Sequence, residues 1–190
     1  MKPFQFMTLY ITRRCNLKCS YCGVYSTEIE DMSTNEWIKA LDLIIPHSEF
    51  FNILGGEPTL HEGLPSIIRH LEKKQALYSL VTNSTNTKEY YKKLVEEDGI
   101  SSFTISIDYY DIPNEENSSV YKTKRGQELV KFLRQIGYKG EIVFSTALRE
   151  ENVDEMKKII NFGRDYNCKM VFCMLQMYSQ EKHLYIVLWY

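Results

Sequence analysis

The chain has 190 residues, of which 44% are hydrophobic and 25% charged, and its formal net charge is −2. This length fits one domain with a substantial core, and the near-balanced charge argues against nucleic acid as a partner. No apolar run approaches the roughly 20 residues that cross a bilayer, and the N-terminus lacks a long apolar signal region. We therefore expect neither a membrane span nor a signal peptide.

Strand-like and helix-like segments alternate along the chain. The apolar pattern predicts strands over residues 4–12, 50–54, 77–82, 102–108, 141–147 and 169–175. A helix is predicted from Ser33, because Ser33-Thr-Asn-Glu36 reads as a capping box. Further helices are predicted around the apolar face of Leu64, Ile67, Ile68 and Leu71, and over residues 87–97, 127–136 and 153–162.

Six such alternations, with connections long enough for parallel pairing, predict an α/β fold of parallel strands with outer helices. The pattern alone does not separate an open sheet from a barrel. The polar face of residues 102–108 favours a curved sheet with a wet interior, since a sheet covered on both faces would be apolar throughout. We expect one domain over residues 1–190. The chain ends soon after the sixth strand, which points to a barrel truncated there or completed by a partner chain.

Five cysteines are present, and three of them fall within eight residues, Cys15-Asn-Leu-Lys-Cys19-Ser-Tyr-Cys22. This odd, crowded set differs from the even disulfide frameworks of secreted domains, so we expect a reducing, cytoplasmic location. Cys168 and Cys173 lie on one predicted strand and should face opposite ways, so they cannot both complete a four-thiolate zinc site. A zinc loop completed by one distant cysteine stays an alternative.

Three thiolates on one loop can instead hold three irons of a [4Fe–4S] cluster and leave the fourth iron open, as a catalytic metal requires. The loop follows the first predicted strand, at the carboxyl edge where α/β proteins place their ligands.

A second motif, Asn52-Ile-Leu-Gly55-Gly56-Glu57-Pro58, ends the second predicted strand. Its two glycines would let a ligand approach the backbone closely, and Pro58 stiffens the turn. Exposed carbonyls and the Glu57 carboxylate could hold a ligand's ammonium group. Taken alone, the motif reads equally well as a tight turn that opens a helix.

Together, the Cys15-x-x-x-Cys19-x-x-Cys22 and Gly55-Gly56-Glu57-Pro58 patterns resemble the signatures of the radical S-adenosylmethionine (SAM) superfamily. The resemblance covers nearly the whole chain and implies a partial (β/α)₆ barrel, similar to the core of the molybdenum-cofactor and peptide-modifying enzymes. It implies that the cysteines bind a [4Fe–4S] cluster and that the glycine motif binds the methionine amino group of SAM.

Weaker matches to the same family imply further residues for SAM or substrate. They are Tyr21, Asn83 (followed by Ser84 where the family commonly has glycine), Ser106, Asp108 and Ser145. Each has a plain structural alternative: Asn83 as a turn former, Asp108 as a cap, Ser145 as a small interior residue. Tyr109 and Tyr110 are candidates for the lining of a substrate pocket. The basic cluster of residues 122–125 is expected on the solvated surface.

The activity that the resemblance implies is reductive cleavage of SAM to a 5′-deoxyadenosyl radical, which abstracts hydrogen from a substrate. A peptide or protein substrate is favoured over a small molecule, and an electron donor such as flavodoxin or ferredoxin is implied. Two alternatives stay open: a glycyl-radical activase, and a non-catalytic zinc or binding module that retains the fold.

Overall fold

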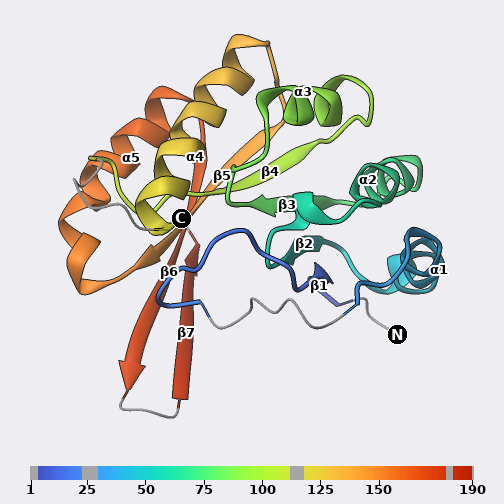
Figure 1. Cartoon of the computed structure of the whole chain (residues 1–190), viewed down its shortest axis with the longest axis horizontal. Helices are drawn as coiled ribbons and strands as arrows, with labels where there is room; N and C mark the ends of the chain where they lie inside the picture. The colour runs from blue at the N-terminus through green and yellow to red at the C-terminus, as the bar shows by residue number, and fades with distance from the viewer. Residues whose placement is uncertain (1–3, 23–29, 112–117, 179–181, 190) are drawn as a thin grey trace. The chain divides into compact units, whose positions relative to one another are not determined.

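The computed structural model describes residues 4–22, 30–111, 118–178 and 182–189. The chain forms two compact units (Figure 1). The first consists of Met1–Thr82 with Asn86–Phe103, and the second of Asn83–Thr85 with Thr104–Tyr190.

Three parallel strands alternate with helices in the first unit: β1 (Met7–Thr12), β2 (Phe51–Gly55) and β3 (Tyr78–Thr82). Ile53 of β2 is paired with Leu9 of β1 and with Leu80 of β3, so β2 is the central strand of the three. The helices are α1 (Thr34–Ile44), α2 (Leu64–Lys73) and α3 (Lys88–Glu96), with the short 3₁₀ helices η1 (Ile45–His47) and η2 (Pro58–Leu60).

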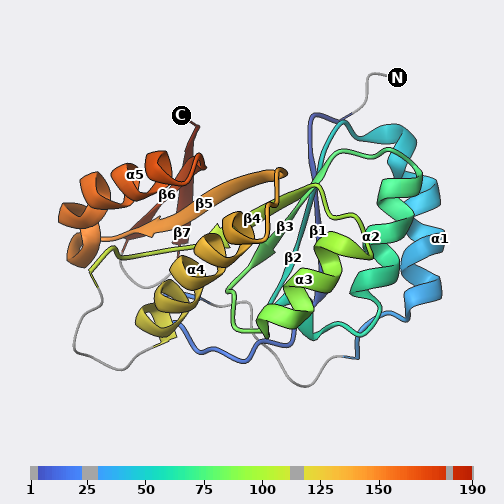
Figure 2. The same cartoon turned by 90° about the horizontal axis from the view of Figure 1, so that it is seen from above.

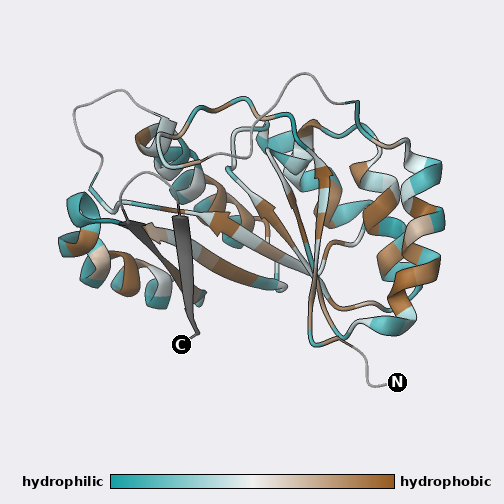
Figure 3. Ribbon diagram, turned by 90° about the horizontal axis from the view of Figure 1, so that it is seen from below, coloured by the Kyte–Doolittle hydropathy of each residue, from teal (hydrophilic) through white to brown (hydrophobic). Residues whose placement is uncertain are grey.

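Local sequence explains where these helices begin and which side they bury. Helix α1 begins at the predicted capping box, in which the Ser33 hydroxyl accepts from Glu36 N and the Glu36 carboxylate accepts from Ser33 N. Helix α2 buries its predicted apolar face completely, and α1 and α2 lie side by side (Figure 2). Figure 3 shows the apolar and polar faces of these helices in contrasting colours.

The two faces of the β1–β3 sheet differ in burial. One face carries the buried residues Leu9, Ile11, Phe51, Ile53 and Leu80. On the opposite face, Tyr10 is 52% exposed and Leu54 and Val81 are half-buried. The first face therefore packs against the helices, and the second is less buried at these three positions.

The second unit is built from the end of β4 (Ser102–Ser106), then β5 (Glu141–Leu148), β6 (Lys169–Tyr178) and β7 (Lys182–Trp189). Strands β5 and β6 are parallel, whereas β7 pairs antiparallel to β6. The helices are α4 (Ser118–Gln135), the 3₁₀ helix η3 (Glu150–Glu155) and α5 (Met156–Asp165).

Helix α4 approaches β4 very closely at Gly126. A Cβ at this position would lie 3.0 Å from the carbonyl oxygen of Ser106 and 3.0 Å from a side-chain carbon of Ile107. Helices α4 and α5 are neighbours, because the Arg134 guanidinium donates to the carbonyl oxygens of Tyr166 and Asn167 just after α5.

The elements differ from the predicted ones in two places. The helix predicted over residues 127–136 begins at Ser118, so the basic residues 122–125 lie on α4. The chain also adds a strand after the sixth one, because residues 182–189 pair with β6. Among the described residues, no helix is both long and apolar enough to cross a membrane.

Candidate functional site

The cysteine loop (residues 13–22) leaves the end of β1 in the first unit. Thr12 is buried, and its hydroxyl accepts a hydrogen bond from Arg14 N at 3.0 Å, which turns the chain out of the strand. Cys15, Cys19 and Cys22 are all half-buried, and Cys22 N donates to the carbonyl oxygen of Cys19 at 3.0 Å. The three thiols are thus carried by one compact turn.

The thiols of the loop lie within electrostatic reach of one another. Burial raises the pKa of the Cys15 thiol, the amide of Leu17 opposes this with a hydrogen bond to Cys15 Sγ at 3.4 Å, and negative charge on Glu57, Cys22 and Cys19 raises the pKa further. Soft sulfur donors that repel one another's negative charge fit a positively charged iron–sulfur cluster, which would relieve the repulsion.

The arrangement differs from that of a single-ion site. Within the described ranges, no three Cys, His, Asp or Glu side chains converge closely enough to hold one metal ion. An iron–sulfur cube makes a different demand, because each thiolate binds a different iron atom.

The glycine turn (residues 55–58) lies directly against the cysteine loop. Gly56 N donates to the carbonyl oxygen of Thr12 at 2.9 Å, and Glu57 N donates to that of Arg14 at 2.8 Å. A Cβ on Gly55 would lie 2.2 Å from Thr12 O, and one on Gly56 would lie 2.2 Å from Arg14 O. Both glycines are therefore required for backbone packing between the two motifs, a reason that differs from the ligand approach expected from the sequence.

Glu57 is buried, with 1% of its surface exposed, and joins the glycine turn to the end of β3. Its Oε1 atom accepts from Thr59 N at 3.1 Å, Thr59 Oγ1 at 2.7 Å and Thr82 Oγ1 at 2.8 Å. The Thr82 hydroxyl has one proton and donates it to Glu57. The Tyr91 hydroxyl, 2.8 Å from Thr82 Oγ1, must therefore be the donor in the bond between these two hydroxyl groups. Pro58 is buried as the first residue of η2.

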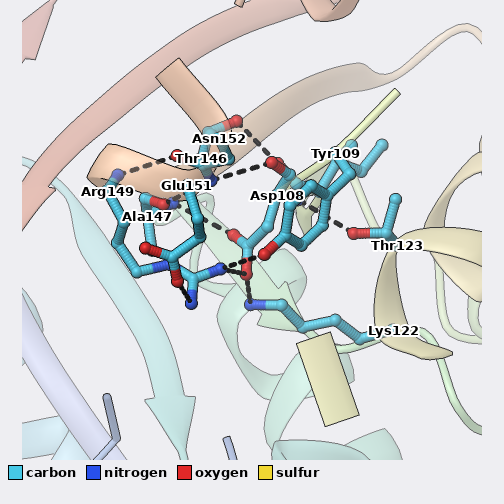
Figure 4. Close-up of polar contacts among 10 residues, drawn as sticks. Asp108, Tyr109, Lys122, Thr123, Thr146, Ala147, Arg149, Glu151 and Asn152 are labelled. Atoms are coloured by element: carbon cyan, nitrogen blue, oxygen red, sulfur yellow. Dashed lines mark hydrogen bonds and ion pairs between the residues drawn. The ribbon is translucent and has the colours of Figure 1, made fainter. Parts of the chain in front are cut away.

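In the second unit, the segment after β4 (residues 107–111) centres on Asp108, whose surface is fully buried. Figure 4 shows its carboxylate facing Lys122 of α4 and Arg149 after β5. Asp108 Oδ2 lies 2.9 Å from Lys122 Nζ and 3.8 Å from Arg149 Nη2, and Oδ1 accepts from Ala147 N at 3.1 Å.

The backbone of Asp108 is held as firmly as its carboxylate. Asp108 N donates to Thr123 Oγ1 at 3.0 Å, and Asn152 Nδ2 donates at 2.9 Å both to Asp108 O and to Ala147 O (Figure 4). Asn152 is 1% exposed, and its side chain cross-links the chain after β4 to the end of β5. Asp108 is consequently an ion-paired anchor whose backbone is also hydrogen-bonded to two other segments.

Sequence reasoning missed Lys122 and Arg149. Lys122 was expected on the solvated surface with its basic neighbours, and this is wrong, since only 6% of its surface is exposed. The available signal was its spacing from Gly126: on a helix that begins before residue 122, positions 122 and 126 share the face that meets β4. Arg149 carries no local signal of this kind.

The remaining predicted residues have mixed surroundings. Asn83 Oδ1 accepts from Thr85 N at 3.0 Å and from Thr85 Oγ1 at 2.6 Å, which is the turn-forming role given as its alternative. Ser84 has a φ of 65°, in the left-handed region that favours glycine, so a backbone constraint explains the glycine that the family pattern has here. Ser106 is half-buried at the last position of β4, and Tyr21 is half-buried in the turn before Cys22.

Ser145 and the two tyrosines after β4 are placed differently from one another. Ser145 O accepts from Ile107 N at 3.0 Å. Burial raises the pKa of the Cys173 thiol, and a hydrogen bond with the Ser145 side chain opposes that rise. Tyr109 is buried with its hydroxyl 3.0 Å from Arg149 Nη2, whereas Tyr110 is 40% exposed and packs edge-on against Phe162 of α5.

Within the first unit, therefore, the structure brings the three cysteines and residues 55–58 into one site. Within the second, it gathers around Asp108 the residues that hold it, which are Lys122 and Thr123 of α4, Ala147 of β5, and Arg149 and Asn152 after β5.

Comparison with known proteins gives a consistent result. The model of the radical SAM superfamily matches residues 9–163. The chain is 36% identical over 103 residues to Fe-coproporphyrin III synthase of Methanosarcina barkeri, covering 52% of this chain and 26% of that protein. It is 25% identical over 197 residues to GTP 3′,8-cyclase of Peptoclostridium acidaminophilum, covering 97% of this chain and 59% of that protein. The chain thus spans about a quarter to three fifths of the length of these curated relatives.

Among solved structures, the chain resembles Streptococcus suis SuiB with a TM-score of 0.78 and 15% identity, over 94% of this chain and 41% of SuiB. SuiB bound to its precursor peptide SuiA gives a TM-score of 0.74 at 17% identity, over 91% of this chain and 39% of that one. The likeness confirms the predicted fold class, an α/β fold of the partial (β/α)₆ barrel type with parallel strands and outer helices.

Proposed function

Because the chain belongs to the radical SAM superfamily, we propose that it is an enzyme that cleaves SAM reductively, using a [4Fe–4S] cluster held by Cys15, Cys19 and Cys22. Membership in this family implies SAM and an iron–sulfur cluster. The observation that carries the proposal is the pair of hydrogen bonds from Gly56 N to Thr12 O and from Glu57 N to Arg14 O. They fix a three-thiol loop to a glycine turn, so a cluster on one and a ligand on the other would be neighbours.

The chain's own residues would bind and orient the reactants. Cys15, Cys19 and Cys22 would hold three irons of the cluster, which would leave the fourth iron for SAM. When bound, the cluster and SAM supply a 5′-deoxyadenosyl radical that removes hydrogen from a substrate. Carbonyl groups of the glycine turn, together with the Glu57 carboxylate, would bind the methionine ammonium group. Tyr21 would lie near the adenine.

We assign the residues of the second unit to SAM or substrate in the same way. Asn83, Ser106 and Ser145 would contribute polar contacts. Asp108 would act through the segment that it holds, because its carboxylate is buried in ion pairs with Lys122 and Arg149. The reducing electron would come from a carrier protein such as flavodoxin or ferredoxin.

A peptide or protein is the favoured substrate. The support is the similarity in fold to SuiB, which has been solved with its precursor peptide. A small molecule is the second candidate, since the similarity in sequence to GTP 3′,8-cyclase extends over 97% of this chain.

The direct test is an anaerobic assay for 5′-deoxyadenosine from SAM and dithionite with the reconstituted chain. We expect several iron and sulfide ions per chain and slow formation of 5′-deoxyadenosine, both lost in the Cys15→Ala/Cys19→Ala/Cys22→Ala variant. Cys168→Ala is the matched control and should keep both, because the Cys168 thiol donates to the carbonyl oxygen of Tyr166. Stoichiometric zinc without iron in an anaerobic preparation would instead favour a zinc-stabilised binding module.

A further inference from the structure

The side chain of Arg14, directly before Cys15, joins three segments of the first unit. Its Nε and Nη2 atoms donate to Asp31 Oδ2 at 2.9 and 2.6 Å, and Nη2 also donates to the carbonyl oxygen of Leu60 at 2.9 Å. Asp31 lies on the segment that leads into α1, and Leu60 ends η2. One guanidinium group therefore ties the start of the cysteine loop, the approach to α1 and the end of the glycine-turn region together.

The neighbours of these residues make further ties of the same kind. The backbone of Arg14 accepts from Glu57 N at 2.8 Å. His61, the residue after Leu60, accepts at Nδ1 from Gly63 N at 3.0 Å, so its proton is on Nε2 and is donated to the carbonyl oxygen of Met32 at 2.9 Å. Asp31 is thus held by Arg14, and Met32 is held by His61, which directly follows η2.

We propose that Arg14 is a positioning residue that fixes the cysteine loop against the glycine turn. The inference rests on the proposed function, in which the cysteines hold the cluster and the glycine turn receives the methionine end of SAM. Arg14 then sets the distance between these two parts of the site without contacting either reactant.

The geometry requires arginine in particular. The guanidinium makes its three bonds from two nitrogen atoms in a fixed plane, whereas a lysine ammonium is a point charge on a flexible stem. The side chain of Arg14 is 44% exposed and that of Asp31 13%, so the charge pair alone adds little to global stability. Losing the guanidinium contacts of Arg14 should therefore alter the position of the cysteine loop while leaving the fold intact.

The test uses the variants Arg14→Lys and Asp31→Asn, with Arg13→Lys as the matched control. Arg13 is the exposed neighbour, and its side chain makes no hydrogen bond or ion pair within the described part of the chain. The reconstituted, reduced proteins are titrated with SAM and followed by the electron paramagnetic resonance of the cluster. We expect SAM binding about threefold to tenfold weaker in Arg14→Lys and Asp31→Asn, with unchanged iron content and unchanged Tm, and a change of less than about twofold in Arg13→Lys.

A second readout needs no cluster. In the metal-free chain, alkylation of each cysteine is followed by peptide mass spectrometry, with Cys168 as the internal reference. Loss of the Arg14 guanidinium contacts should raise the alkylation rates of Cys15, Cys19 and Cys22 about threefold or more, and leave the rate of Cys168 unchanged. The double variant Arg14→Lys/Asp31→Asn should show no greater effect than Arg14→Lys alone, because that substitution already removes the bonds to Asp31.

The outcomes separate this inference from the proposed function. A wild-type chain that takes up no cluster overturns the proposed function, and the positioning of SAM falls with it. A wild-type chain that cleaves SAM, beside an Arg14→Lys variant with wild-type SAM affinity and wild-type alkylation, overturns the role of Arg14 alone. Equal effects of Arg13→Lys and Arg14→Lys would also overturn it, since general loss of arginine would then be the cause.

Discussion

The cysteine loop and the segment after β4 are both fixed by residues distant in sequence, but through different forces. The cysteine loop meets the glycine turn through backbone hydrogen bonds, and two glycines make room for the contact. The segment after β4 is fixed by a buried carboxylate between two cationic side chains. Backbone contacts tolerate little change in volume, whereas a buried ion pair tolerates little change in charge. Substitutions of each kind should therefore affect the two regions unequally.

The largest effect is expected where charge is removed from the second region. Lys122→Met leaves the buried Asp108 carboxylate with Arg149 at 3.8 Å as its cationic neighbour, and should lower the free energy of unfolding by about 3 kcal/mol or more. Lys124→Met, on the same helix but exposed, should change it by less than about 0.5 kcal/mol. Urea unfolding of both variants measures the difference, and similar losses in the two would refute an ion-paired anchor.

Adding side-chain volume where the cysteine loop meets the glycine turn should have the next largest effect on stability. In Gly56→Ala the new methyl group would lie 2.2 Å from Arg14 O, a backbone atom that cannot rotate away. We expect a loss of about 3 kcal/mol in the free energy of unfolding, together with loss of iron uptake.

The matched control for that change is Gly163→Ala on α5. There the nearest atom is the sulfur of Met170 at 3.2 Å, at the end of a flexible side chain, and alanine favours the helix. The change in the free energy of unfolding should stay within about 1 kcal/mol. If Gly56→Ala were tolerated as well as this control, the close backbone packing of the glycine turn against the cysteine loop would be disproved.

A smaller loss is expected at the hydrogen bonds of Thr82, which join β3 to the glycine turn. Thr82→Val removes the donor to Glu57 Oε1 and the acceptor of the Tyr91 hydroxyl, and should cost about 2 kcal/mol in the free energy of unfolding. Thr8→Val, at an exposed position of β1, should be nearly neutral. Thermal unfolding with both variants checks this, and a neutral Thr82→Val would mean that the Glu57 contacts do not hold the turn.

The smallest expected effect is a pH dependence of stability that comes from Glu155, which binds the backbone at the exposed end of the segment after β4. Burial works to raise the pKa of Glu155, but hydrogen bonds from Asp111 N, the Lys158 ammonium and Tyr110 N outweigh it and lower the pKa. A lowered pKa in the folded state stabilises the fold above the unfolded value of about 4.3, and this contribution is lost as the pH falls below it.

The Glu155→Gln variant isolates that contribution. At pH 6 it should be less stable than the wild type by less than about 1 kcal/mol, and the difference should shrink as the pH approaches 3.5. A difference that stays constant over this range would show that the carboxylate charge is not involved.

The two regions also differ in how far their residues could be predicted from the sequence. The cysteines and Gly55-Gly56-Glu57-Pro58 are short motifs with fixed spacing, so their positions after β1 and β2 follow from the strand pattern alone. The reason for the glycines did not follow, because it depends on how closely two strand ends approach each other in space.

The contacts of Asp108 were beyond prediction, since its partners Lys122 and Arg149 come from two other elements. The start of α4 was also misplaced, because the polar composition of residues 118–125 resembles a loop until its contacts with the end of β4 are known. Local sequence patterns predicted the helices and strands. Which polar side chains are buried depends instead on contacts between residues that lie tens of positions apart in the sequence.

The proposed function requires that the cysteine loop hold a [4Fe–4S] cluster with one open iron beside the glycine turn. Mössbauer spectroscopy of the ⁵⁷Fe-reconstituted chain, recorded with and without SAM, tests this directly. We predict that SAM gives one iron a distinct signal while the other irons are unchanged. A spectrum that SAM leaves unaltered, or a chain that takes up no cluster, would rule out this function.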